Sequence, residues 1–121
     1  MQRSLATLVA DADLDPALLS YGPLSLDLDG FAVAVRGQDV PVTLSEFLLL
    51  TAFARNPYRV LDRAALVDVL RGSAAFDGRD GADLRLIDRH ISRLRKKLHD
   101  AGCDCIRTMR FAGYRFIPPT G

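Results

Sequence analysis

The fold is decided by the stretch from Leu84 to Leu98, which reads LRLIDRHISRLRKKL. At about 100° per residue along a helix, four apolar side chains of this stretch fall within about 60° of one another, namely Ile87, Ile91, Leu94 and Leu98. The opposite side carries Arg85, Arg89, Ser92 and Lys96, flanked by Arg93. We therefore expect one helix from about Leu84 to His99, capped by Asp83 and ended by Gly102, with an apolar face toward a core and a basic face toward solvent.

The basic face is unusual because it contains no acidic residue, and Asp88 falls between the two stripes. A neutral solvated helix usually mixes Glu or Asp into its outer face. Guanidinium groups match phosphates and the O6/N7 edge of guanine. From charge alone, a DNA-binding face and a merely solvated helix remain alternatives.

Charge is distributed unevenly along the 121 residues, whose net charge is only +1. Between Leu84 and Arg115, nine Arg and Lys face three Asp, a net of +6, so the remainder carries −5. Such asymmetry points to a face that binds a polyanion.

Two shorter helices are predicted before this one. Thr43-Leu44-Ser45-Glu46 is a capping box that opens a helix to about Arg55, which Asn56-Pro57 stops; its inner stripe is Phe47, Leu50, Thr51 and Ala54. Asp62 caps a second helix, from Arg63 to about Leu70, and the segment from Gly72 to Ala82 is a loop. A short helix, a loop and a basic helix form the helix-turn-helix arrangement, whose last helix enters the major groove.

Strands are predicted on both sides of the helices. Leu24–Leu28, Phe31–Arg36 and Asp39–Val42 form an antiparallel meander with the third strand, which contains Pro41, at an edge. Cys105–Thr108 and Tyr114–Ile117 form a hairpin around a turn at Arg110–Gly113, which would be a wing. Met1–Ser20 has weak helical periodicity and predicts a short helix or a ragged arm.

Length and composition fit one globular domain, since 49% of the residues are apolar and 26% are charged. Disorder, a membrane span and a signal peptide are all disfavoured, so we expect a cytoplasmic chain. We divide it into an arm at 1–23, a domain at 24–118 and a tail at 119–121.

The sequence resembles the C-terminal effector domain of OmpR/PhoB-type response regulators of two-component systems. The resemblance rests on Leu84–Leu98, on Ile106–Phe116 and on Val42–Phe47 with the Arg55-Asn56-Pro57 ending. It implies an α+β fold, a winged helix-turn-helix with an N-terminal antiparallel four-stranded sheet, three helices and a C-terminal hairpin wing. The function it implies is sequence-specific binding of double-stranded DNA in transcription regulation, with pairs of domains on tandem half-sites.

The resemblance also implies residue roles. Arg89 and Arg93 would face base edges in the major groove, and Arg85, Ser92 and Arg95 would contact or steer toward phosphates. Thr108 would touch the backbone near the wing, and Arg110 would enter the adjacent minor groove. Lys96 and Arg107 complete the set of DNA-binding residues that we predict.

Three departures from the family pattern stand out. Phe111 replaces the glycine that usually follows the wing arginine; because a bulky residue disfavours positive φ, we expect a differently shaped wing tip. Phe111 itself packs on a sugar or a neighbouring subunit, or folds back onto the domain. Arg71-Gly72 stands where the family commonly closes the second helix with Trp-Gly. The loop Gly72–Ala82 that follows corresponds to a segment that can touch RNA polymerase in the family, although a plain connection is favoured here. Only 23 residues precede the first predicted strand, too few for a phosphorylated receiver domain.

Other chemistry has weaker support. Cys103 and Cys105 are too close in sequence for an ordinary disulfide, and with His99 they supply only three of the four ligands of a structural metal site. We expect reduced thiols, a structural His90, no cofactor and no enzymatic activity. The rival function is a winged-helix module that binds a protein rather than DNA, and a weaker third is redox or metal sensing through the two cysteines.

Overall fold

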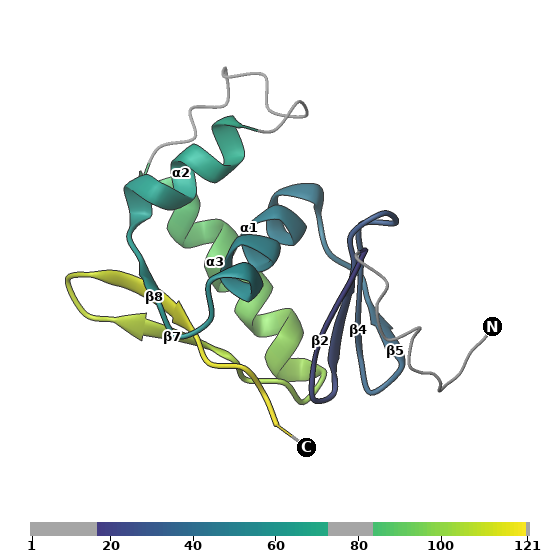
Figure 1. The fold of residues 1–121 in the computed structure, drawn as a ribbon. Helices are drawn as coiled ribbons and strands as arrows, with labels where there is room; N and C mark the ends of the chain where they lie inside the picture. The colour runs from purple at the N-terminus through teal and green to yellow at the C-terminus, as the bar shows by residue number, and fades with distance from the viewer. Residues whose placement is uncertain (1–16, 73–83, 121) are drawn as a thin grey trace.

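The computed structural model describes residues 17–72 and 84–120, which form a sheet on either side of three helices (Figure 1). The first sheet is an antiparallel meander of β2 (Leu18–Tyr21), β3 (Leu24–Asp27), β4 (Ala32–Val35) and β5 (Gln38–Val40). Leu24 and Leu26 of β3 are fully buried, whereas the residues between and after them are not, so the predicted alternation is confirmed. β5 lies at the edge as predicted, and Pro41 falls just outside it.

The first strand, β2, was not predicted from the sequence. Leu18–Tyr21 was expected to lie in or beside a short helix or ragged arm, but it pairs with β3 through the register Leu18↔Asp27 to Tyr21↔Leu24. The strand has no strict apolar-polar alternation because it is an edge strand whose side chains are at most half-buried, with Leu18 and Ser20 exposed. What fixes it is tertiary: the Tyr21 hydroxyl donates to Ala54 O at 2.7 Å, and its ring lies edge-on to Phe116. The remainder of the predicted arm, residues 1–16, lies outside the described part of the chain.

The helices are α1 (Leu44–Arg55), α2 (Arg63–Arg71) and α3 (Leu84–Asp100). The predicted caps are confirmed: Thr43 and Glu46 form the reciprocal capping box, and the Asp62 carboxylate accepts from Ala65 N at 2.8 Å. The predicted apolar stripe of α3 is buried throughout, since Ile87, Ile91, Leu94 and Leu98 are at most 1% exposed. The predicted loop Gly72–Ala82 and the cap Asp83 fall almost wholly outside the described residues.

The second sheet has the order β6-β8-β7, built from β6 (Val60–Leu61), β7 (Ile106–Met109) and β8 (Gly113–Phe116). The hairpin β7–β8 is the predicted wing, and its tip extends away from the body of the molecule (Figure 1). β6 was not predicted, because two residues are too few to show a periodicity. Gly113 lies against β6, where a Cβ would overlap Leu61 O and come within 2.7 Å of Asp62 Cα.

One expectation about the wing is wrong. Phe111 was expected to reshape the tip by avoiding positive φ, yet it adopts φ 65°, the left-handed conformation that glycine favours. It also does not fold back onto the domain, because 95% of it is exposed. The turn is closed by Ala112 N donating to Met109 O at 2.9 Å, so the pairing of the hairpin evidently outweighs the local preference of one residue.

Candidate nucleic-acid interface

The outer side of α3 carries a stripe of exposed polar and basic side chains, which we call the basic stripe: Arg85, Arg89, Ser92, Arg93 and Lys96. The stripe faces solvent because the apolar residues of the opposite side are anchored in the core. Arg85, Arg89 and Arg93 make no hydrogen bond or ion pair with other residues in the described part of the chain. Their guanidinium groups are therefore available to an external partner.

Lys97 belongs to the same basic run but points the other way. Its ammonium donates to Glu46 Oε1 at 2.6 Å, and the Glu46 side chain is only 2% exposed. The same oxygen accepts the Thr43 backbone N–H of the capping box at 2.9 Å. This contact joins the C-terminal half of α3 to the first turn of α1 and so fixes how the basic stripe is presented.

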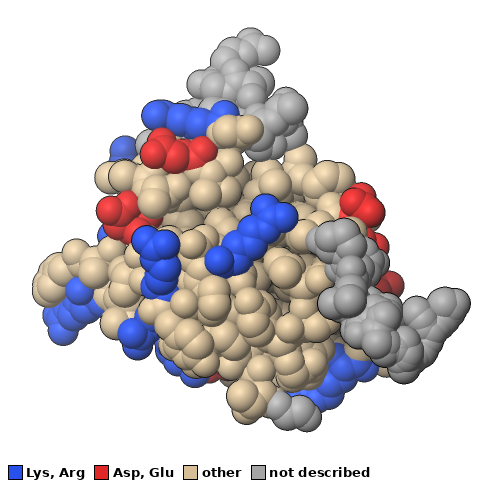
Figure 2. Space-filling model, in the orientation of Figure 1, with Lys and Arg blue, Asp and Glu red and all other residues tan. Residues whose placement is uncertain are grey.

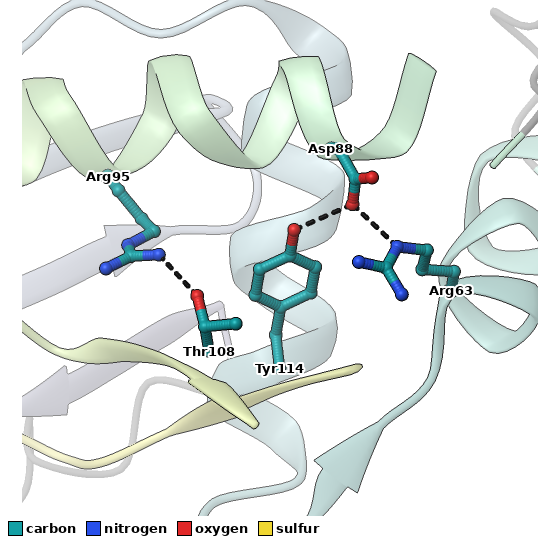
Figure 3. A network of polar contacts seen from close by, with 5 residues as sticks. All are labelled: Arg63, Asp88, Arg95, Thr108 and Tyr114. Carbon is teal, nitrogen blue, oxygen red and sulfur yellow. Dashed lines mark hydrogen bonds and ion pairs between the residues drawn. The ribbon is translucent and has the colours of Figure 1, made fainter. Parts of the chain in front are cut away.

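Asp88 connects α3 to both α2 and the wing (Figure 3). Its Oδ1 accepts from the Tyr114 hydroxyl at 2.7 Å and from Arg63 Nε at 2.7 Å. Burial by itself raises the pKa of Asp88, but the hydrogen bonds from Tyr114 and Arg63 and the Arg63 charge outweigh it, so the pKa lies below its ordinary value. Burial and the hydrogen bond to Asp88 raise the pKa of Tyr114. The carboxylate therefore stays charged and neutralises Arg63 rather than the basic stripe.

A second connection between α3 and the wing lies further along the helix. Arg95 Nη1 donates to Thr108 Oγ1 at 2.8 Å (Figure 3). Between the helix and the hairpin lies a hollow of about 440 Å³, whose lining includes Ser92 and charged residues of both signs: Asp88, Arg95, Lys96, Asp100 and Asp104. Mixed charge makes this hollow a poor site for an anion, so the exposed stripe beside it is the stronger candidate.

Two other predicted contact residues are paired with acids. Lys96 lies 3.1 Å from Asp100 and Arg107 lies 3.0 Å from Asp104, both on the surface. Exposed pairs of this kind are weak, on the order of 0–1 kcal/mol, so a phosphate can displace them. The sequence did not indicate these pairings, although the i,i+4 spacing of Lys96 and Asp100 could have suggested one.

At the wing tip, Arg110 is exposed and its guanidinium carbon lies 5.3 Å from the centroid of the Phe111 ring.

The face of the molecule in Figure 2 shows Lys and Arg side chains mostly set singly among uncharged surface, with acidic residues beside some of them. That face offers no continuous basic surface.

The remaining candidates have structural surroundings. His90 is half-buried, and burial together with Arg93 and Arg89 lowers its pKa against the opposing effect of Glu46; the lowered pKa favours the neutral imidazole. Cys103 and Cys105 are buried free thiols; the hydrogen bond between them lowers the pKa of Cys103 and raises that of Cys105.

Within residues 17–72 and 84–120, no group of three or more His, Cys, Asp or Glu is placed to hold a metal ion. Over the same ranges, no helix is long and apolar enough to cross a membrane.

Residues 37–116, which include all three helices and the wing, match the family described as "Transcriptional regulatory protein, C terminal". The chain belongs to this family. The resemblance to OmpR/PhoB-type effector domains, and the winged helix-turn-helix fold that it implied, are thereby confirmed.

Individual relatives agree with the family. The sensory transduction protein RegX3 of Mycolicibacterium smegmatis is 35% identical over 107 residues, which are 87% of this chain and 45% of RegX3. The DNA-binding response regulator MtrA of the same species is 33% identical over 119 residues, 97% of this chain and 50% of MtrA. The chain thus spans about half the length of these relatives. The RstA DNA-binding domain of Klebsiella pneumoniae, solved in complex with the RstA box, is 36% identical with a TM-score of 0.68, over 84% of this chain and 98% of that domain.

Proposed function

We propose that this chain binds double-stranded DNA in a sequence-specific manner and regulates transcription, with α3 in the major groove and the wing in the adjacent minor groove. The observation that carries the proposal is the basic stripe, whose three arginines are exposed and unpaired within the described residues while the opposite face of the same helix is buried. The family and the DNA complex of the similar RstA domain support it. The role requires no catalysis, and it would place the chain in the compartment that holds the DNA.

We assign base contacts to Arg89 and Arg93, which lie one helical turn apart on the stripe. Arg85 and Ser92 contact phosphates, and Arg110 reaches the minor groove. Arg95 and Thr108 are already bonded to each other, so a phosphate would join an existing contact between the helix and the wing. Lys96 and Arg107 add charge once a phosphate displaces Asp100 and Asp104.

Selection of duplexes from a random pool tests base readout directly. Arg89→Ala is expected to relax the base preference at one or two positions, since a good bidentate contact discriminates by about 1–3 kcal/mol. Arg95→Ala is the matched control, an Arg on the same helix that is expected to weaken binding to all duplexes alike. An unchanged motif with Arg89→Ala would mean that Arg89 does not read bases, and an unchanged motif with both Arg89→Ala and Arg93→Ala would mean that α3 does not.

Salt dependence tests the electrostatic part. If about four phosphates are neutralised, the slope of log affinity against log salt is about −3.6. Salt-insensitive binding to a protein, with no retention on any duplex at low salt, would instead favour the protein-interaction module.

A single module of this kind buries only about 600–1,000 Å² on DNA, which limits affinity. We therefore also propose that two copies bind tandem half-sites, tested by the stoichiometry of the complex on duplexes with one and two copies of the selected site. Contact with RNA polymerase through the segment after Gly72 stays a prediction, because residues 73–83 lie outside the described part of the chain.

A further inference from the structure

The most exposed large apolar residue among those that the structure describes is Phe111, at the tip of the wing. The other residues of this kind are between 39% and 62% exposed, whereas Phe111 is 95% exposed. An aromatic ring held in water forgoes the burial that stabilises apolar side chains elsewhere in the fold. Beside the ring lies the Arg110 guanidinium, whose central carbon is 5.3 Å from the ring centroid.

The backbone at this position is also unfavourable for a residue with a Cβ. Phe111 has φ 65°, and an L-residue other than Gly, Asn or Asp rarely adopts this conformation. The turn is nevertheless closed by the Ala112 N to Met109 O hydrogen bond and continues into the paired residues Met109 and Gly113. The hairpin therefore holds the ring exposed to solvent in the turn between β7 and β8. The tip of this hairpin extends away from the body of the molecule (Figure 1).

We propose that Phe111 is a DNA-contacting residue, which places its ring in the minor groove against a base step while Arg110 beside it faces the groove's negative potential. This inference rests on the proposed DNA binding and adds an uncharged, aromatic side chain to the residues that contact DNA. Phenylalanine is one of the apolar residues that minor-groove proteins insert at base steps, and narrow minor grooves attract arginine. The wing is held beside α3 by Asp88–Tyr114 and Arg95–Thr108, so a helix seated in the major groove brings the tip to the neighbouring minor groove.

The proposal has a consequence for sequence preference. Pyrimidine–purine steps such as TA are the most easily unstacked, so the duplexes that the chain selects are expected to carry such a step where the wing lies. This preference comes from deformability and not from hydrogen bonds to base edges.

Phe111→Gly is the decisive variant, because it removes the ring and at the same time relieves the positive φ. If the ring had only a structural role, Phe111→Gly would leave DNA affinity unchanged, because glycine adopts the φ of this position without strain. If the ring contacts a base step, Phe111→Gly is expected to weaken binding by roughly 5- to 150-fold, the range for loss of one aromatic–base contact. The salt slope is expected to stay the same, whereas Arg110→Ala is expected to reduce it by about 0.9. Phe111→Trp, which keeps a large ring, is expected to retain most of the affinity.

The experiment uses the duplex that the wild-type chain selects from a random pool, in a set of copies that each carry 2-aminopurine at one adenine. Wild type is expected to raise the 2-aminopurine fluorescence at one base step, the step at which the wing lies. Phe111→Gly is expected to bind the same duplex without that rise. Wild-type affinity in Phe111→Gly, or the same fluorescence rise from both proteins, would overturn the proposal while leaving DNA binding intact. Failure of the wild type to select any duplex would instead overturn the proposed function itself.

Discussion

The contact between Lys97 and Glu46 gives the sharpest prediction about stability. Lys97→Met keeps the length of the side chain but removes the ammonium. Among the described residues, the Glu46 carboxylate in the core then keeps only the Thr43 N–H as a hydrogen-bond donor. Breaking a buried ion pair in this way costs about 3–5 kcal/mol. Because the Lys97 side chain is 35% exposed, water reaches part of the site, and we expect a loss of about 2–3 kcal/mol.

That loss is a large part of the stability of a small domain, which is about 5–15 kcal/mol in total. At roughly 4–8 °C per kcal/mol, the midpoint of thermal unfolding is expected to fall by about 10–20 °C. Urea unfolding followed by circular dichroism measures the free energy, and calorimetry measures the midpoint.

The neighbouring lysine supplies a matched control. Lys96→Met removes an ammonium from a surface pair whose side chains are 76% and 60% exposed, so the expected loss is about 0.5 kcal/mol or less. The double variant Glu46→Gln with Lys97→Met is expected to recover part of the loss, because no uncompensated charge is then buried. Equal losses for Lys96→Met and Lys97→Met, or no recovery in the double variant, would refute the reasoning.

Two further predictions concern the wing. Tyr114→Phe is expected to lower the free energy of unfolding by about 0.5–1.5 kcal/mol at pH 7. The pKa of Asp88 is lowered in the folded protein, so the stability contributed by its charged form is complete above the unfolded pKa and is lost as the pH falls through the folded pKa. The difference in free energy of unfolding between wild type and variant, measured by urea unfolding, should therefore shrink in acid. Gly113→Ala is expected to lower the free energy of unfolding by about 4 kcal/mol or more, because the added Cβ would overlap Leu61 O. Gly37→Ala, also at positive φ but in open space, is expected to lose only about 1–2 kcal/mol in the same assay, and equal losses would mean that the close approach at Gly113 does not matter.

Local patterns in the sequence predicted most of the helical part of the fold. Caps act within four residues, and the apolar stripe of α3 repeats at the helical period, so Thr43, Asp62 and Ile87 could be assigned without knowing their neighbours in space. The exposed side of the same helix followed from the same period, which is why the basic stripe was predictable as a surface.

Tertiary structure alone decided what each charge and each short strand does. The run Arg95-Lys96-Lys97 is uniformly basic in sequence, yet these side chains contact Thr108, Asp100 and Glu46 in turn, because adjacent helical residues point about 100° apart toward different elements. β2 pairs with β3, the next strand along the chain, and its Tyr21 is fixed by the distant Ala54, whereas β6 exists only through pairing with the distant β8. Hairpin closure places Phe111 at positive φ against its own preference. The sequence thus determined which helix presents a basic face, by local periodicity; only the packed structure decided which cations remain on that face, since a partner such as Glu46 lies 51 positions away along the chain.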